Sequence, residues 1–232
     1  MGGADSDVAP SGRLTLPVQL LLAFVAGVLY PLAFAPFHLW PLTFASAAVL
    51  FWLLSRAEGQ MPLLAWVFGL GKYAVGVSWI YVSIHQYGGA SPLLAGAMVT
   101  VFVAFMALFC LPIGWFLGKL KASNQHISKS ALAMGFVATW VLMEWMLTWF
   151  LTGFPWLFAG QAMLGTPLQG YAPVIGTFGL SLVVMTITAA AMLSADQAQT
   201  SRVRIGTAGA VLVLVGLGIS LDTQVWTKST GR

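Results

Sequence analysis

Two uncharged stretches of the sequence, residues 78–92 and residues 151–161, combine aromatic rings with glycines and small polar side chains. Rings suit contact with acyl chains, whereas hydroxyl, amide and backbone groups suit contact with a polar head group. Together they would fit an amphipathic ligand. The alternative interpretation is that the rings only anchor the protein at a membrane interface, where aromatic side chains gather.

Two charged residues, Lys72 and Glu144, lie within apolar stretches of the sequence. A charge at membrane depth is costly, so it is usually paired or functional. Two interpretations follow. The two residues form an ion pair across helices, or Glu144 faces a ligand.

The sequence indicates neither a metal site nor a nucleophilic catalytic site. The three histidines, His38, His85 and His126, are scattered over different segments, so the sequence predicts no metal site and no cofactor. Cys110 is the single cysteine, and its apolar surroundings favour a small buried hydrophobe over a nucleophile. No GxSxG, P-loop or HExxH motif occurs in the chain.

The composition identifies the environment in which these residues act. Of the 232 residues, 59% are hydrophobic and only 7% are charged. Soluble domains carry roughly a quarter charged residues, and disordered chains are poor in hydrophobic residues, so both classes are excluded. The net charge of +4 comes from scattered residues and not from a basic run, which argues against nucleic acid as a partner.

The apolar runs predict an all-α fold, a polytopic transmembrane helix bundle of about seven spans that occupies the whole chain. A span needs about 20 residues, and short breaks with glycine, proline or polar residues separate the runs. The expected spans are residues 14–30, 37–54, 61–82, 92–120, 131–151, 168–193 and 205–221.

The positive charges predict the orientation of these spans. With the N-terminus in the cytoplasm, the cytoplasmic segments hold Arg13, Arg56, Lys119, Lys121, Lys129, Arg202 and Arg204. The opposite loops, at residues 31–36, 83–91 and 152–167, contain no Lys or Arg. This bias follows the positive-inside rule. Seven spans place the C-terminus on the far side, where Lys228 and Arg232 break the pattern.

Several stretches of the chain resemble the membrane domain of the apolipoprotein N-acyltransferases, which are enzymes of the bacterial inner membrane. They occur in family order and at family spacing over nearly the whole chain. The matching stretches are residues 32–37 with Trp40 and Pro41, then 76–84, 88–92, 151–156 and 170–173.

The resemblance implies a function, partners and a location. Members of the family take an acyl chain from a phospholipid donor and transfer it to the N-terminal diacylglyceryl-cysteine of a lipoprotein acceptor. They lie in the bacterial cytoplasmic (inner) membrane, here with a cytoplasmic N-terminus and a periplasmic C-terminus. Their catalytic Glu-Lys-Cys set belongs to a periplasmic nitrilase-like domain that follows the seventh span and precedes an eighth. No catalytic residue can be carried over to this chain, so we expect it to be inactive alone.

The same resemblance assigns candidate lipid contacts in the two uncharged stretches. The rings of Trp79, Tyr81, Tyr87, Phe154 and Trp156 would line the acyl path, with Pro155 between the last two. Ser83, His85, Gly88 and Gly89 would meet the polar head, and Glu144 is the buried candidate.

The chain departs from the family pattern after Glu144. The family usually has Arg-Gly where this sequence has Leu147 and Thr148. An arginine there would suit a phosphate contact, and its absence makes a pairing of Glu144 with Lys72 more attractive. The departure supports an alternative function, a non-catalytic homologue that binds lipids or a partner. Reading the coding DNA beyond Arg232 would separate the two. The sequence makes no prediction of oligomeric state.

Overall fold

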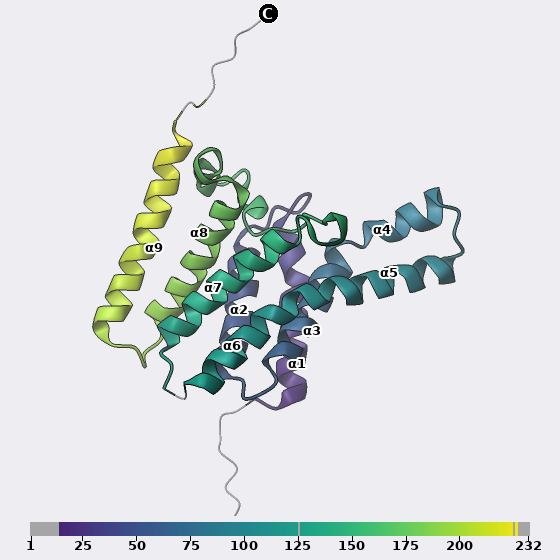
Figure 1. Ribbon diagram of the computed structural model, residues 1–232. Helices are drawn as coiled ribbons and strands as arrows, with labels where there is room; N and C mark the ends of the chain where they lie inside the picture. The colour runs from purple at the N-terminus through teal and green to yellow at the C-terminus, as the bar shows by residue number, and fades with distance from the viewer. Residues whose placement is uncertain (1–13, 125, 225, 227–232) are drawn as a thin grey trace, which may run out of the picture.

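A computed structural model describes residues 14–124, 126–224 and 226 of the chain (Figure 1). These residues form helices and connecting loops without any strand, which confirms the predicted all-α class. The α-helices are α1 (Leu16–Leu29), α2 (Pro41–Arg56), α3 (Met61–Gly76), α4 (Trp79–Val82), α5 (Pro92–Ala107), α6 (Leu111–Ser123), α7 (Lys129–Met146), α8 (Ala172–Ala195) and α9 (Ser201–Asp222). The short helices are η1 (Tyr30–Ala33), η2 (Ser83–Tyr87, a π-helix), η3 (Leu108–Cys110), η4 (Phe150–Thr152), η5 (Gln161–Met163) and η6 (Pro167–Tyr171).

Local sequence signals mark where these helices begin. The side chains of Ser91, Ser128 and Thr200 cap α5, α7 and α9 by accepting hydrogen bonds from backbone N–H groups of the first turn. Capping satisfies donors that have no partner within the helix. Proline also marks the start of a helix, because a first-turn N–H has no partner within the helix and is not missed. Proline occupies the first turn of α1, α2, α3, α5, α6 and α8.

By length and composition, four segments of the described chain could each cross a membrane. They are Leu16–Ala33, Pro92–Ser123, Pro167–Ala195 and Ser201–Asp222. A fifth candidate, Met61–Gly76 with Trp79–Tyr87, is bent by 50° at its break. Helix α2 is shorter, and α7, which contains Glu144, is not among the candidates. The expected number of seven spans therefore stays a prediction.

The ends of the expected spans differ from those of the observed helices, and three spans also differ in continuity. The expected span 61–82 is broken after Gly76, and the expected span 92–120 continues through η3 to Ser123. The expected span 131–151 is helical from Lys129 to Met146 and then leaves the α conformation. At the end of this stretch, Leu151, Thr152 and Gly153 all have positive φ angles.

The basic residues gather at one end of the bundle, called the basic end below. This end contains the start of α1, the α2–α3 connection, the α6–α7 turn and the α8–α9 turn (Figure 1). The basic residues on these elements are Arg56, Lys119, Lys121, Lys129, Arg202 and Arg204. The predicted clustering is confirmed for them, whereas Arg13, Lys228 and Arg232 lie outside the described residues. Which side of the membrane the basic end faces remains a prediction.

The bundle core is built from aromatic rings between η1, α3 and α7. The Trp140 ring is fully buried and lies 5.7 Å from the Tyr30 ring and 5.9 Å from the Phe68 ring, between centroids. At the edge of the bundle, α9 packs on α8 and η6 and buries only Gly218. Its apolar side chains face outward, as expected for contact with lipid.

Helix α4, the π-helix η2 and the first part of α5 form an arm that projects from the bundle (Figure 1). These elements contact one another, and side chains at the tip are open, with Tyr87 86% exposed. The arm carries most of the first uncharged stretch, residues 78–92. The position of the arm therefore determines which residues of this stretch lie near the second, residues 151–161.

Candidate functional site

A cavity of about 770 Å³ lies at the end of the bundle opposite the basic end. It is called the Trp79–Trp156 cavity below, and its lining combines three segments that are far apart in the sequence. The lining residues are Pro31, Leu32, Ala33, Phe34, Ala35, Pro36, Phe37, His38, Val75, Gly76, Ser78, Trp79, Trp156, Leu157, Gln161, Ala162 and Leu164. Mostly apolar walls with a few polar groups are typical of small-molecule sites.

Two of the predicted site residues meet at this cavity. The rings of Trp79 and Trp156 are 5.8 Å apart between centroids, and both side chains are about half exposed. Trp156 also contacts Phe154 at 5.9 Å, and Phe154 packs edge-on against Phe102 of α5 at 5.4 Å. The four rings make a continuous aromatic row from the cavity wall to the base of the arm.

Two glycines allow the backbone to build this site. A Cβ atom at Gly76 would lie 2.3 Å from Cδ1 of Leu157, so a larger residue there would require the Leu157 side chain to move. Gly153 has a φ of 84°, and a Cβ atom there would lie 2.3 Å from the carbonyl oxygen of Thr148. Glycine accepts both conditions without steric cost. The turn at Gly153 leads directly into the segment that carries Trp156.

Glu144 anchors the segment at residues 154–161, called the 154–161 loop below. Its Oε1 accepts hydrogen bonds of 2.8 Å from Nε1 of Trp140 and from the backbone N–H of Ala159. The next N–H, of Gly160, donates to Oγ of Ser181 on α8 at 2.8 Å. Glu144 is fully buried and does not line the cavity. It therefore lies behind the loop and holds it from the core side.

Lys72 is also fully buried, but the expected direct ion pair with Glu144 is not formed. Among the described residues the ion pair within 4 Å joins Lys129 and Asp196, not Lys72 and Glu144. The Lys72 Nζ atom instead lies over the rings of Tyr30, Tyr73 and Trp140, at 4.7, 5.3 and 5.5 Å from their centroids. Rings attract cations through their electron-rich faces. The Trp140 side chain thus contacts both Lys72 and Glu144.

The remaining predicted contacts lie on the arm, away from the Trp79–Trp156 cavity. The Tyr81 and His85 rings are 5.5 Å apart, and Nδ1 of His85 lies 2.8 Å from the carbonyl oxygen of Ala90. The Gly88 N–H donates to the Ser83 carbonyl oxygen at 2.9 Å. Gly89 has a φ of 68°, which turns the chain toward α5. The structure therefore places Tyr81, Ser83, His85, Tyr87, Gly88 and Gly89 outside the lining of the cavity, although the Ser83 hydroxyl donates to the Trp79 carbonyl oxygen at 3.5 Å.

Sequence reasoning missed one wall of the cavity. The segment at residues 31–38 and the pair Gln161 and Leu164 line it, although none was predicted as a contact. Residues 32–37 did provide a signal, since they match the family pattern. Their side chains, however, are apolar or small and suggest packing when no neighbour is known.

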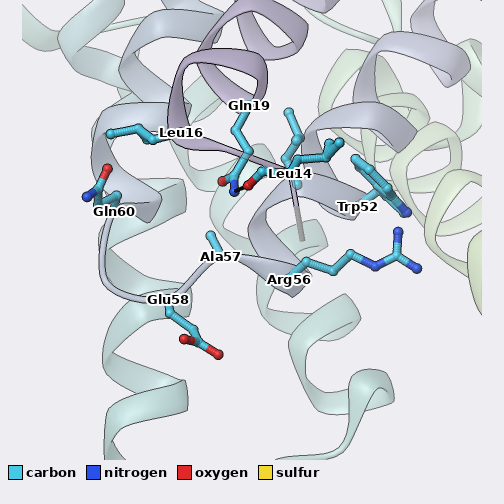
Figure 2. Close-up of a pocket in the computed structure, with 9 residues that line it drawn as sticks. Leu14, Leu16, Gln19, Trp52, Arg56, Ala57, Glu58 and Gln60 are labelled. Carbon is cyan, nitrogen blue, oxygen red and sulfur yellow. Dashed lines mark hydrogen bonds between the residues drawn. The ribbon is translucent and has the colours of Figure 1, made fainter. Parts of the chain in front are cut away.

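A second cavity, of about 660 Å³, lies at the basic end (Figure 2). Figure 2 shows side chains from the start of α1, the end of α2 and the α2–α3 connection around it. The guanidinium carbon of Arg56 lies 4.4 Å from the ring centroid of Trp52, and Gln19 donates to the Leu14 carbonyl oxygen at 2.8 Å. None of the predicted site residues lines this cavity.

Comparison with known proteins places the chain in a family. The family description that matches is "Apolipoprotein N-acyltransferase N-terminal domain", and the match covers residues 26–190, more than half of the chain. The segments that line the Trp79–Trp156 cavity lie within this range.

Individual relatives share the same name, apolipoprotein N-acyltransferase. The relative from Pseudomonas syringae pv. tomato is 39% identical over 214 residues, which is 91% of this chain and 42% of that protein. The relative from Coxiella burnetii is 42% identical over 178 residues, 72% of this chain and 34% of that protein. The chain thus spans about two fifths, or less, of the length of these two curated relatives. It belongs to the apolipoprotein N-acyltransferase family.

Proposed function

We propose that this chain is the membrane part of an apolipoprotein N-acyltransferase and that the Trp79–Trp156 cavity holds an acyl chain of the phospholipid donor. In this proposal the acyl group passes to the N-terminal diacylglyceryl-cysteine of a bacterial lipoprotein. The observation that carries the proposal is the cavity itself. It joins three segments with the family pattern at the end of the bundle that is predicted to face the periplasm.

The chemistry of the cavity fits a phospholipid better than a polar metabolite. Its walls are mainly proline, alanine, leucine and aromatic side chains, which suit a hydrocarbon chain. Polar groups at His38, Ser78 and Gln161 could meet the ester region of the lipid. Its volume lies within the roughly 300–1,000 Å³ of ordinary ligand sites.

The chain is not proposed to perform the transfer alone. Acyl transfer in this family implies a thiolate nucleophile, and Cys110 is the single cysteine of this chain. The Cys110 side chain is 1% exposed, and its sulfur faces the Met143 sulfur at 3.9 Å in the core. We therefore propose that the nucleophile comes from a nitrilase-like domain outside this chain.

Photocrosslinking of phospholipid tests the binding proposal. The chain would be reconstituted with phosphatidylethanolamine that carries a photoreactive group on one acyl chain, and crosslinked peptides would be mapped by mass spectrometry. We expect crosslinks at the cavity wall, reduced roughly 2- to 10-fold by Trp79→Ala or Trp156→Ala, since a ring contact contributes about 0.5–1.5 kcal/mol.

A second tryptophan pair provides the matched control. Trp145 and Trp149 are 5.2 Å apart, are also about half exposed and do not line the cavity. Trp145→Ala should leave the yield at the cavity wall unchanged. Equal losses for Trp145→Ala and Trp156→Ala, or crosslinks spread evenly over the bundle, would count against the site.

Leu147 favours a second candidate function, a non-catalytic homologue that binds lipid or a protein partner. Leu147 is 1% exposed and packs in the core, where the family pattern has an arginine. Purified native protein, of whatever length the cell makes, would be assayed for acylation of a diacylated lipopeptide. Transfer supports the first function, whereas lipid binding without transfer supports the second.

A further inference from the structure

The interior between η1, α3 and α7 contains four buried polar atoms for which the described residues offer no hydrogen-bond partner. They are the hydroxyl oxygens of Tyr30 and Tyr73, Nζ of Lys72 and Oε2 of Glu144, and all four residues are 0% exposed. A buried polar group without a partner is destabilising, and more so when it is charged. The large majority of buried side-chain polar atoms in native proteins have a partner, so a cluster of four points to a bound small molecule.

These groups form one electrostatic cluster. Lys72 Nζ lies over the Tyr30 and Tyr73 rings, and Glu144 interacts electrostatically with Tyr30, Lys72 and Tyr73. The ammonium and the carboxylate are too far apart for a direct bond but carry opposite charges. A small molecule that both donates and accepts hydrogen bonds would satisfy the whole set.

We propose that ordered water bridges Lys72 Nζ to Glu144 Oε2, with the Tyr30 and Tyr73 hydroxyls as further partners, and that this buried ion pair positions the 154–161 loop. Buried water typically makes two to four hydrogen bonds, and four polar atoms supply them. A water-mediated bond has nearly the enthalpy of a direct one. Each tyrosine hydroxyl can either donate to the water or accept from it, so both can take part.

The two oxygens of Glu144 then have different roles. Oε1 accepts from Trp140 and from the 154–161 loop, whereas Oε2 has no hydrogen-bond partner among the described residues and would accept from the proposed water. A charged acceptor makes the bond to the Ala159 N–H stronger than a neutral acceptor would. Glu144 is therefore a positioning residue for Trp156. Its importance for lipid binding rests on the proposed function, whereas the existence of the water-bridged pair is independent of that function.

A double-mutant cycle tests the ion pair. Thermal unfolding of the purified chain in detergent would be measured for Lys72→Met, Glu144→Gln and the double variant. Each single change leaves one buried charge without its partner, so we expect Tm to fall by about 6 °C or more. The double variant removes both charges and should unfold above the less stable single variant. A decrease equal to the sum of the two single decreases would overturn the pair.

Two substitutions at Glu144 separate the pairing role from the loop-positioning role. Glu144→Gln keeps a carbonyl acceptor for Trp140 and Ala159, whereas Glu144→Leu removes it. A nitroxide at Leu164→Cys, in a Cys110→Ala background, would report the motion at the end of the loop. We expect a more mobile spectrum with Glu144→Leu but a nearly unchanged one with Glu144→Gln. A label at Leu212→Cys on the outer face of α9 should be insensitive to both.

The outcomes are distinguishable from those of the lipid test. Coupling in the thermal cycle without any lipid crosslink would support the buried pair and reject the lipid cavity. Equal mobility of the Leu164→Cys label in Glu144→Leu and the parent would reject the positioning role. A high-resolution structure of the native protein that shows density between Lys72 Nζ and Glu144 Oε2 would support bound water, and a continuous apolar contact there would exclude it.

Discussion

Trp140 donates a 2.8 Å hydrogen bond from its indole nitrogen to Glu144, and the face of the same ring lies 5.5 Å from the Lys72 ammonium. One side chain therefore contacts both buried charged residues, each with the part of the indole that suits it. The positive edge meets the carboxylate, and the negative face meets the cation. This arrangement links α3 to α7 through an aromatic ring rather than through a direct ion pair.

Removing the indole donor should destabilise the bundle. Trp140→Phe keeps most of the ring volume but leaves Glu144 with one fewer hydrogen bond in a buried position. Hydrogen bonds to charged groups contribute about 1.5–3 kcal/mol, so we expect Tm in detergent to fall by roughly 3–12 °C. Trp145→Phe is the matched control, because Trp145 is 48% exposed. Equal Tm changes for the two variants would contradict the role of the bond.

The turn before the 154–161 loop should not tolerate a side chain. Gly153→Ala forces alanine to a φ of 84° and brings its Cβ to within 2.3 Å of the Thr148 carbonyl oxygen. The left-handed conformation alone costs about 1–2 kcal/mol, and the clash adds to it. We expect a lower Tm and fewer crosslinks at Trp156. Gly216→Ala on α9, where a Cβ would meet nothing within 4 Å, should leave both quantities unchanged.

The Lys129–Asp196 ion pair should make stability depend weakly on pH. The hydrogen bond from Lys129 lowers the pKa of Asp196 below its usual value, and the Ala198 N–H also donates to that carboxylate. A lowered pKa in the folded state means that the pair stabilises above the pKa of the unfolded chain. The contribution is lost as the pH falls through the folded value.

The expected size of this effect is small, because both side chains are partly exposed. Exposed pairs contribute roughly 0–1 kcal/mol, which corresponds to a Tm change of at most about 4 °C. Unfolding would be followed between pH 3 and pH 7 for the parent and for Asp196→Asn. The difference in Tm should shrink toward pH 3. A difference that does not change with pH would show that the charge of Asp196 is not what stabilises the turn.

Cysteine labelling tests the predicted orientation. In a Cys110→Ala background, Tyr87→Cys on the arm should react with a membrane-impermeant maleimide in spheroplasts with intact membranes. Gln197→Cys, in the α8–α9 turn at the basic end, should react only after the membrane is permeabilised. Both positions are exposed, so different reactivity reports the side of the membrane. The reverse pattern would place the basic end outside.

Much of the fold could be predicted because membrane helices leave a strong signal. The apolar runs, the breaks between them and the positions of Arg56, Lys129 and Arg202 were enough to predict most of the helices and the basic end. The break after Gly76 was not predicted. The residues around it are as apolar as those of a continuous span, and the packing of Gly76 against Leu157 joins segments that are far apart in the sequence.

The candidate site could be predicted only in part for the same reason. Trp79 and Trp156 have side chains whose chemistry is conspicuous, and the structure brings them together. His85 and Ser83 have equally conspicuous chemistry, but their hydrogen bonds are made to backbone carbonyl oxygens within the arm, those of Ala90 and Trp79. The direct pairing of Lys72 with Glu144, one of two interpretations, was wrong because a sequence shows two opposite charges and not the Trp140 ring that contacts both.

The shallow packing of α9 has a consequence for how the bundle assembles. This helix buries only Gly218. Two hydrogen bonds join it to η6: the Tyr171 hydroxyl donates to the Leu214 carbonyl oxygen, and the Gln169 side-chain amide donates to the Asp222 carboxylate. The position of α9 on the bundle therefore depends on its contacts with α8 and η6 rather than on buried side chains of its own.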